Sequence, residues 1–250
     1  MLVGFLSFFA RAENKNVQLV PFNQFDRANW PQPVEDSMIH SLTLVDYLDY
    51  RGGDVKSVDW DIINWTGGDT QRIWIKSEGN KKTTYPNTGE TDFQLLYGKL
   101  LSSYFDAQMG LRFEQLWSVK ENQNRFFAVV GIQGLALYSY ELDTALFLSQ
   151  SGDLSGRLTA SEDFLFTQRF ISQIRIEANA GLQKVEKYDV GAGLNDITLG
   201  FRLRYEIRRE LAPYVGYSWT KRFSDSADFA NQNGLAIVDS NLVAGIRMWF

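Results

Sequence analysis

Met38 and His40 stand two residues apart in the stretch "DSMIHSL" and carry the side chains that best suggest a metal site. Thioether sulfur and imidazole nitrogen are the ligand types that suit Cu(I). Residues two apart in a strand lie on the same face, so both ligands would point the same way if a strand begins here. Two ligands leave the coordination incomplete. The alternative is an apolar and a polar residue of ordinary structural function at the rim of a sheet.

A second set of candidates consists of charged side chains that recur at every second position. In "FDAQMGLRFE", charged Asp106, Arg112 and Glu114 alternate with apolar Met109 and Leu111. Mixed signs on one face are more typical of a hydrogen-bonded network that fills a narrow barrel than of an ion-selective pore. We predict a lumen network of Asp106, Arg112, Glu114, Glu141, Arg175, Glu177, Arg202, Arg204, Glu206 and Arg247.

The single histidine of the chain limits its enzymatic chemistry. Lipases, acyltransferases and proteases built on membrane barrels need a base, usually histidine, near the outer leaflet or the outer mouth. His40 lies at the start of the first predicted strand, which is the end of the strand away from the outer mouth. We therefore expect that the protein is not an enzyme.

Strands must position these side chains, because apolar and polar residues alternate with a period of two along most of the chain. The clearest segment is "NDITLGFRLRYEI", in which Leu199, Phe201 and Leu203 lie on one face and Arg202 and Arg204 on the other. Segments of about ten alternating residues separated by turn residues are typical of a membrane-spanning β-barrel. The predicted strands are 39–50, 57–65, 70–79, 90–101, 105–117, 125–134, 139–150, 154–166, 171–182, 194–207, 212–222 and 238–250.

These strands predict an all-β protein, a closed antiparallel transmembrane β-barrel, most simply of twelve strands. Tight connections such as "LSSY" and "TQRF" alternate with longer ones at 118–124, 183–193 and 223–237. Such barrels have short periplasmic turns and longer outer loops, and an even strand number returns both ends to the periplasm. Residues 51–79 read either as a hairpin or as one bent strand, so ten strands is the alternative.

A soluble β-sandwich also alternates, but two features favour the barrel. One face is charged along its whole length, which suits a wet lumen and not a sandwich core. The aromatic content is 14%, and several aromatic residues fall near strand ends, as interfacial girdles require. The girdle residues are predicted to be Tyr97, Tyr104, Trp117, Tyr138, Tyr140, Tyr214, Trp219 and Trp249.

Both ends of the sequence fit an exported barrel. "MLVGFLSFFARA" has an apolar stretch and the small-x-small pattern of a signal peptide, so residues 1–12 are expected to be removed before Glu13. A basic n-region is missing, so we expect that the start is truncated; the alternative is that the stretch is a short buried helix and not a signal peptide. Residues 13–37 have no clear period and are expected to form an extended periplasmic leader before the barrel at 38–250. The closing run "NLVAGIRMWF" alternates up to Phe250, as expected of a strand that closes the sheet.

The net charge of −5 argues against nucleic acid as a partner, because phosphate binding needs a basic surface. No run of about 18 apolar residues occurs that would span a bilayer as a helix. We therefore expect the predicted barrel to contact outer-membrane lipid and not to bind nucleic acid.

Several stretches resemble the outer-membrane copper resistance protein B family. They are "LVDYLDYRGGD", "WDIINWTGGDTQRIWIKSEG", "FLFTQRFISQIRIEANA", "GLNDITLGFRLRYEIRRELAPYVGYSWTKRFSDSAD" and the terminal "LVAGIRMWF", which together cover most of residues 38–250. The terminal Phe250 resembles the signal read by the barrel-assembly machinery, a partner that the resemblance implies.

The resemblance implies a barrel in the outer membrane of a Gram-negative bacterium that binds copper ions or moves them across that membrane. A periplasmic copper-binding protein is a further expected partner. Met38 and His40 match the Met and His that the family places before its first strand. The sequence departs from the family in its amino-terminal segment, because residues 13–37 contain no Met or His. High-capacity copper storage is therefore not expected, and a general small-solute pore or a structural barrel is the alternative.

Overall fold

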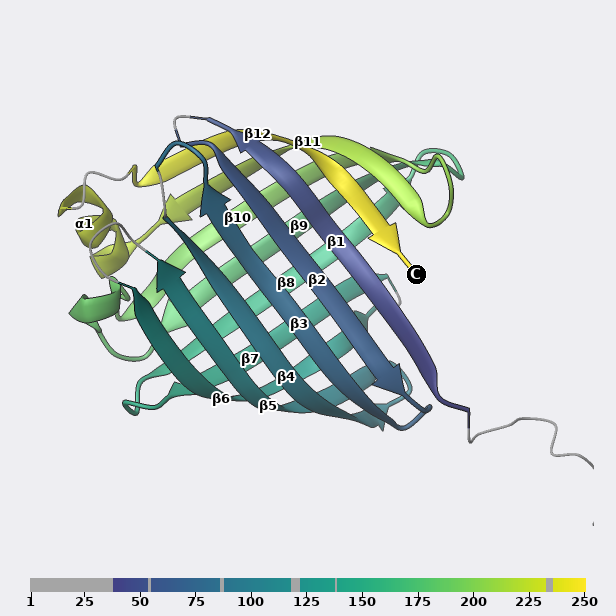
Figure 1. Cartoon of the computed structure of the whole chain (residues 1–250), viewed down its shortest axis with the longest axis horizontal. Coiled ribbons are helices and arrows are strands. Elements are labelled where there is room, and N and C mark those ends of the chain that lie inside the picture. The colour runs from purple at the N-terminus through teal and green to yellow at the C-terminus, as the bar shows by residue number, and fades with distance from the viewer. Residues whose placement is uncertain (1–37, 54, 86–87, 118–121, 138, 233–235) are drawn as a thin grey trace, which may run out of the picture. The chain divides into compact units, whose positions relative to one another are not determined.

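The computed structural model describes residues 38–53, 55–85, 88–117, 122–137, 139–232 and 236–250. Within this part of the chain twelve antiparallel strands form a closed barrel (Figure 1), in which each strand pairs with its sequence neighbours and β1 pairs with β12. The strands are β1 (His40–Gly52), β2 (Ser57–Gly67), β3 (Gln71–Lys82), β4 (Gly89–Ser102), β5 (Phe105–Trp117), β6 (Gln123–Ala136), β7 (Tyr140–Ser149), β8 (Leu154–Leu165), β9 (Phe170–Gly181), β10 (Gly193–Tyr205), β11 (Leu211–Arg222) and β12 (Val238–Trp249). The predicted fold class is confirmed.

The alternation predicted from the sequence matches the two faces of the strands. In β5, Asp106, Arg112 and Glu114 are buried in the lumen, while Met109 and Leu111 are 60% and 67% exposed on the outer surface. Exposed apolar side chains on a surface of this extent would aggregate in water and are stable against lipid. The outer face is therefore the membrane-facing one.

The segment whose strand number was open folds as a hairpin. β2 and β3 pair along their whole length, and the backbone N–H of Gly68 donates to the carbonyl oxygen of Gln71 at 3.0 Å across the turn. This hairpin decides for twelve strands over ten.

β1 contains an irregularity that the period-two pattern did not predict. Its register with both neighbours shifts between Val45 and Leu48, so the buried residues Asp46 and Tyr47 both lie inside the barrel. Before the shift Leu42 and Leu44 line the lumen, and after it Asp49 is buried there. A β-bulge has this effect, because one extra residue exchanges the two faces of a strand.

The pairing of β1 with β12 closes the barrel. Beyond the last residue of β12, the Phe250 N–H donates to the Thr43 carbonyl at 3.0 Å, and the Thr43 N–H donates back at 2.8 Å. The Phe250 side chain is 70% exposed. Closure leaves no free strand edge. A sheet that spans a membrane must be closed in this way, because unpaired backbone groups have no hydrogen-bond partner in lipid.

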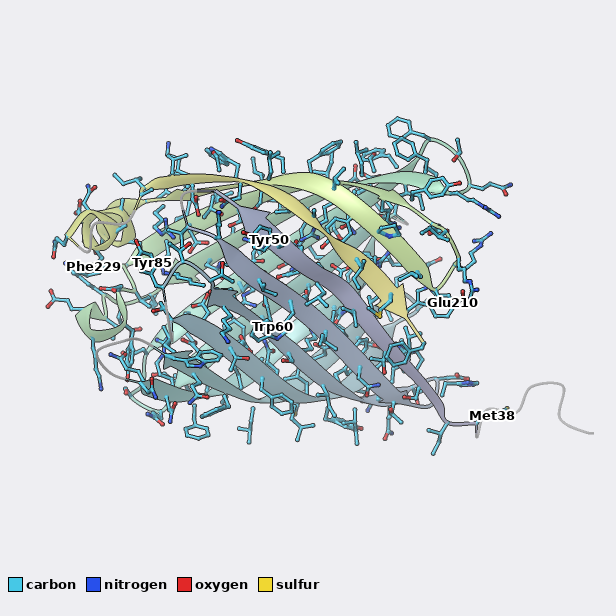
Figure 2. All side chains as sticks on the ribbon, turned by 45° about the horizontal axis from the view of Figure 1, so that its top comes forward. Met38, Tyr50, Trp60, Tyr85, Glu210 and Phe229 are labelled. Carbon is cyan, nitrogen blue, oxygen red and sulfur yellow. The ribbon has the colours of Figure 1, made fainter. Side chains whose placement is uncertain are left out.

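The two mouths of the barrel differ. The terminal mouth carries the start of β1, the end of β12 and the short turns 68–70, 103–104, 137–139, 166–169 and 206–210. The loop mouth carries the longer connections, the 3-10 helix Glu186–Tyr188 and the helix α1 (Ser224–Gln232). Figure 2 shows Met38 and Glu210 at the terminal mouth, and Tyr85 and Phe229 at the loop mouth. The described helices are all too short to cross a membrane.

One of the predicted girdle residues is wrong, and several other predictions fall on residues that the structure does not describe. Tyr214 does not belong to an outer girdle: it is 5% exposed in the lumen, where its hydroxyl donates to Asp49 at 3.1 Å. Tyr214 precedes Val215, which faces outward, so the period-two alternation turns the Tyr214 side chain into the lumen although the residue lies near a strand end. Tyr138, the signal peptide 1–12 and the leader 13–37 lie outside the described residues.

Candidate functional site in the barrel lumen

Met38 and His40 lie together at the terminal mouth. Met38 is 52% exposed, and His40 is an exposed residue that begins β1 opposite Gly67 of β2. The alternation places His40 in the row of Leu42 and Leu44, which line the lumen. No three His, Cys, Asp or Glu side chains among the described residues are grouped so that they could hold a metal ion. The predicted copper pair therefore remains a prediction.

Two cavities follow one another along the lumen. The terminal cavity has a volume of about 480 Å³ and the loop cavity about 460 Å³. Glu78, Phe147 and Arg157 line both cavities, so these three residues stand at the boundary between them. These three residues therefore separate the two cavities.

Arg157 of β8 is the centre of this boundary. Its Nη1 donates to Oε2 of Glu78 on β3 at 2.5 Å, its Nη2 lies 3.7 Å from Asp92 on β4, and its Nε lies 3.8 Å from Glu177 on β9. The hydroxyl of Tyr47 donates to the other oxygen of Glu78 at 3.1 Å. One guanidinium group thus holds carboxylates from three strands.

Arg175 of β9 forms a second cluster beside the first. Its Nη1 lies 3.1 Å from Oδ2 of Asp46 on β1 and 3.2 Å from Oδ2 of Asp61 on β2. Arg247 of β12 shares Asp46, at 3.0 Å. The planar guanidinium group suits such sites, because its several N–H donors reach different carboxylates at once.

The remaining residues of the predicted network lie in different surroundings. Arg112 pairs with Asp92 at 2.6 Å and with Glu114 at 3.0 Å, and Glu114 also pairs with Arg125. Further contacts join Asp106 to Arg72, Arg202 to Asp49, Arg204 to Asp163, and Glu141 to the Ser161 hydroxyl. Glu206 follows the last residue of β10 and forms no ion pair with the described residues.

The lumen also has an apolar wall, which the sequence analysis did not predict. This wall consists of the buried side chains Trp74, Leu96, Phe127, Val129 and Phe147. Gly98 makes room for it, since a Cβ there would lie 2.5 Å from Nε1 of Trp74. The guanidinium carbon of Arg112 stands 4.4 Å from the centre of the Phe147 ring, in a cation–π contact.

The sequence analysis also missed the acidic residues of the first four strands. These are Asp46, Asp49, Asp59, Asp61, Glu78 and Asp92, which are all ion-paired in the lumen. The alternation in "SVDWDIINW" and in "IWIKSEGN" was a sufficient signal for Asp59, Asp61 and Glu78. Asp46 had no such signal, because the bulge in β1 decides its face.

The charges of the two cavities are of mixed sign with an acidic excess. Among the described residues that line the loop cavity, nine are Asp or Glu and five are Arg. The terminal cavity is lined by six Asp or Glu and four Arg or Lys. An acidic lining attracts cations and repels anions. The lumen chemistry therefore favours cations.

The comparisons with known proteins agree with this architecture. The sequence profile of the family "Copper resistance protein B precursor (CopB)" matches residues 39–250. Copper resistance protein B of Escherichia coli is 38% identical, and the copper resistance protein B homolog of Pseudomonas syringae pv. tomato 33%, each over 87% of this chain and 72% of the relative.

Solved structures with a similar fold are the NanC porin and the KdgM porin. Their TM-scores are 0.54 and 0.50 at 14% identity, over 83% and 84% of this chain and 98% and 99% of the porins. At this identity the likeness concerns the fold alone. The matched relatives and the barrel together show that the chain belongs to the copper resistance protein B family of the Gram-negative outer membrane.

Proposed function

We propose that this barrel contributes to copper resistance by binding copper ions and carrying them across the outer membrane through its lumen. The observation that supports this most is the acidic excess of both cavities in a member of a copper resistance family. A copper ion enters a lumen of this charge more readily than an anion of the same size does. The protein acts as a barrel for ions and catalyses no reaction.

The terminal mouth is the proposed point of first contact. Barrels of this class turn their short connections to the periplasm, so Met38 and His40 face that compartment. Neither cavity is lined by Met or His among the described residues, and Met109 is exposed on the membrane face. The soft ligands at the mouth suit Cu(I). The hard carboxylates farther in are weaker partners, which could relay Cu(II) but hold Cu(I) poorly.

The direct test is isothermal titration of copper into the detergent-purified barrel. The double substitution Met38→Ala with His40→Ala is expected to weaken copper binding, because it removes the sulfur and the imidazole together. Met109→Leu is the matched control, since it removes a sulfur from the lipid-facing surface. Equal affinity of the double variant and the unchanged protein would refute the mouth site.

A general pore for small solutes is the second candidate function. It is favoured by the two lumen cavities of about 480 and 460 Å³, which are not built around a metal cluster in the described residues. Growth of a deletion strain on copper separates the two candidates. Copper sensitivity with unchanged uptake of small sugars supports the copper function, and the reverse result supports the general pore.

The proposed partners follow from the surface of the barrel. The exposed apolar outer face contacts outer-membrane lipid, and Phe250 is the signal for the barrel-assembly machinery. A periplasmic copper-binding protein delivers or accepts the ion at the terminal mouth. The acidic balance of the chain, with a net charge of −5, argues against nucleic acid as a partner.

A further inference from the structure

The ion pair between Arg157 and Glu78 crosses the lumen. Arg157 lies on β8 and Glu78 on β3, five strands apart in the ring of twelve. Strands so far apart stand on nearly opposite walls, so the pair spans the interior and does not merely join neighbours. A contact of this kind closes the space through which it passes.

A second crossing strengthens the first. Arg175 on β9 reaches Asp61 on β2, which is also five strands away around the ring. Phe147 lies beside Arg157, with its ring centre 5.8 Å from the guanidinium carbon. Arg157, Glu78 and Phe147 form the layer between the terminal cavity and the loop cavity, and Arg175 and Asp61 line the terminal cavity beside it.

The Arg157 guanidinium group is a cation that lies among carboxylates. Carboxylates of Glu78, Asp92 and Glu177 stand within 3.8 Å of it and come from three different strands. When the guanidinium group moves away, these three carboxylates surround the boundary between the two cavities. A passage with this lining attracts cations and repels anions.

We propose that the barrel contains a cation-selective conduction pathway that Arg157 closes, with its guanidinium group occupying a three-carboxylate position on that pathway. Displacement of Arg157 joins the two cavities into one water-filled path. The pathway conducts small monovalent cations as well, so the proposal goes beyond copper and does not depend on copper being the cargo.

Conductance of the purified full-length barrel in planar lipid bilayers tests the proposal in potassium chloride. The unchanged protein is expected to conduct weakly. Arg157→Gln is expected to raise the conductance several-fold and, under a salt gradient, to give a reversal potential of cation-selective sign. An unchanged conductance, or a selectivity for chloride, would overturn the proposal.

Arg72→Gln is the matched control for the loss of one positive charge. Arg72 lines the terminal cavity, but its partner Asp106 lies on β5, only two strands from β3. The conductance of this variant is expected to remain near that of the unchanged protein. A rise equal to that of Arg157→Gln would mean that net charge, and not the crossing contact, controls conduction.

Two further variants keep the test decisive if Arg157→Gln folds poorly, which the mobility shift of folded barrels on heating reports. Arg157→Lys keeps the positive charge but replaces the planar guanidinium group, with its several N–H donors, by a single ammonium group. A smaller rise in conductance is therefore expected. No rise in conductance would contradict the proposal. Arg157→Gln with Glu78→Gln is expected to stay open but to lose part of its cation selectivity. Selectivity that stays unchanged would show that Glu78 does not line the path.

Discussion

The two sides of the lumen are held together in different ways. The apolar wall of Trp74, Leu96, Phe127, Val129 and Phe147 comes from β3, β4, β6 and β7, whereas the Arg175 cluster joins β9 to β1 and β2. An apolar side chain needs neighbours of suitable volume, and several residue types meet that need. A buried charge needs its partner, because an unpaired charge in a water-poor interior is costly. The charged side should therefore be the less tolerant of substitution.

The largest effect is expected from Arg175→Ala. Among the described residues, the substitution leaves the buried carboxylate of Asp61 without an ion-pair partner and that of Asp46 with Arg247 alone. We expect the free energy of unfolding to fall by roughly 3–5 kcal/mol. Urea-induced unfolding in lipid vesicles, followed by tryptophan fluorescence, measures the change.

Arg169→Ala serves as the control for Arg175→Ala. Arg169 is exposed in the turn 166–169 at the terminal mouth, and its loss should change the free energy of unfolding by no more than about 0.5 kcal/mol. If both variants unfold at the same urea concentration, the charged side does not depend on its partners.

A smaller effect is expected from Tyr214→Phe. The substitution keeps the ring and removes the hydroxyl that donates to the fully buried Asp49. Loss of one donor to a buried carboxylate is expected to cost about 1–3 kcal/mol in unfolding free energy. Tyr217→Phe on the same strand is the matched control, because Tyr217 is 44% exposed on the membrane face. Equal losses in the two variants would contradict the role of the Asp49 contact.

The apolar wall should tolerate a change of shape better. Phe127→Leu keeps an apolar side chain, with a somewhat smaller volume than that of phenylalanine, at a position that is 5% exposed. Its expected cost is below about 1.5 kcal/mol, because neighbouring side chains can repack. The same unfolding measurement applies, and a loss as large as that of Arg175→Ala would remove the difference between the two sides.

The smallest effect is expected on the outer face. Met109→Leu replaces one apolar side chain by another at a position that is 60% exposed to lipid. The free energy of unfolding should change by no more than about 0.5 kcal/mol. A clear loss of stability in vesicles would indicate that Met109 contacts another protein and not lipid.

Much of the fold was predictable because the direction of a side chain in a strand is a local property. Alternation in "FDAQMGLRFE" sufficed to place Arg112 inside and Leu111 outside, and the same rule identified most strands and the closed sheet. The rule failed in β1, where the bulge brings both Asp46 and Tyr47 into the lumen. For Tyr214 the rule would have predicted the lumen correctly, but the prediction of a girdle residue followed from its position near a strand end.

In the strands without a bulge, the sequence by itself determined which residues face the lumen and that their charges are mixed, because both follow from a period of two. The tertiary structure alone decided which charges meet. Asp46 and Arg175 are 129 residues apart, and Glu78 and Arg157 are 79 apart. Their contacts depend on barrel closure, on the stagger between strands and on the bulge in β1, none of which is written in any short segment of the chain. The layer that separates the two cavities is therefore a property of the closed barrel and not of its strands.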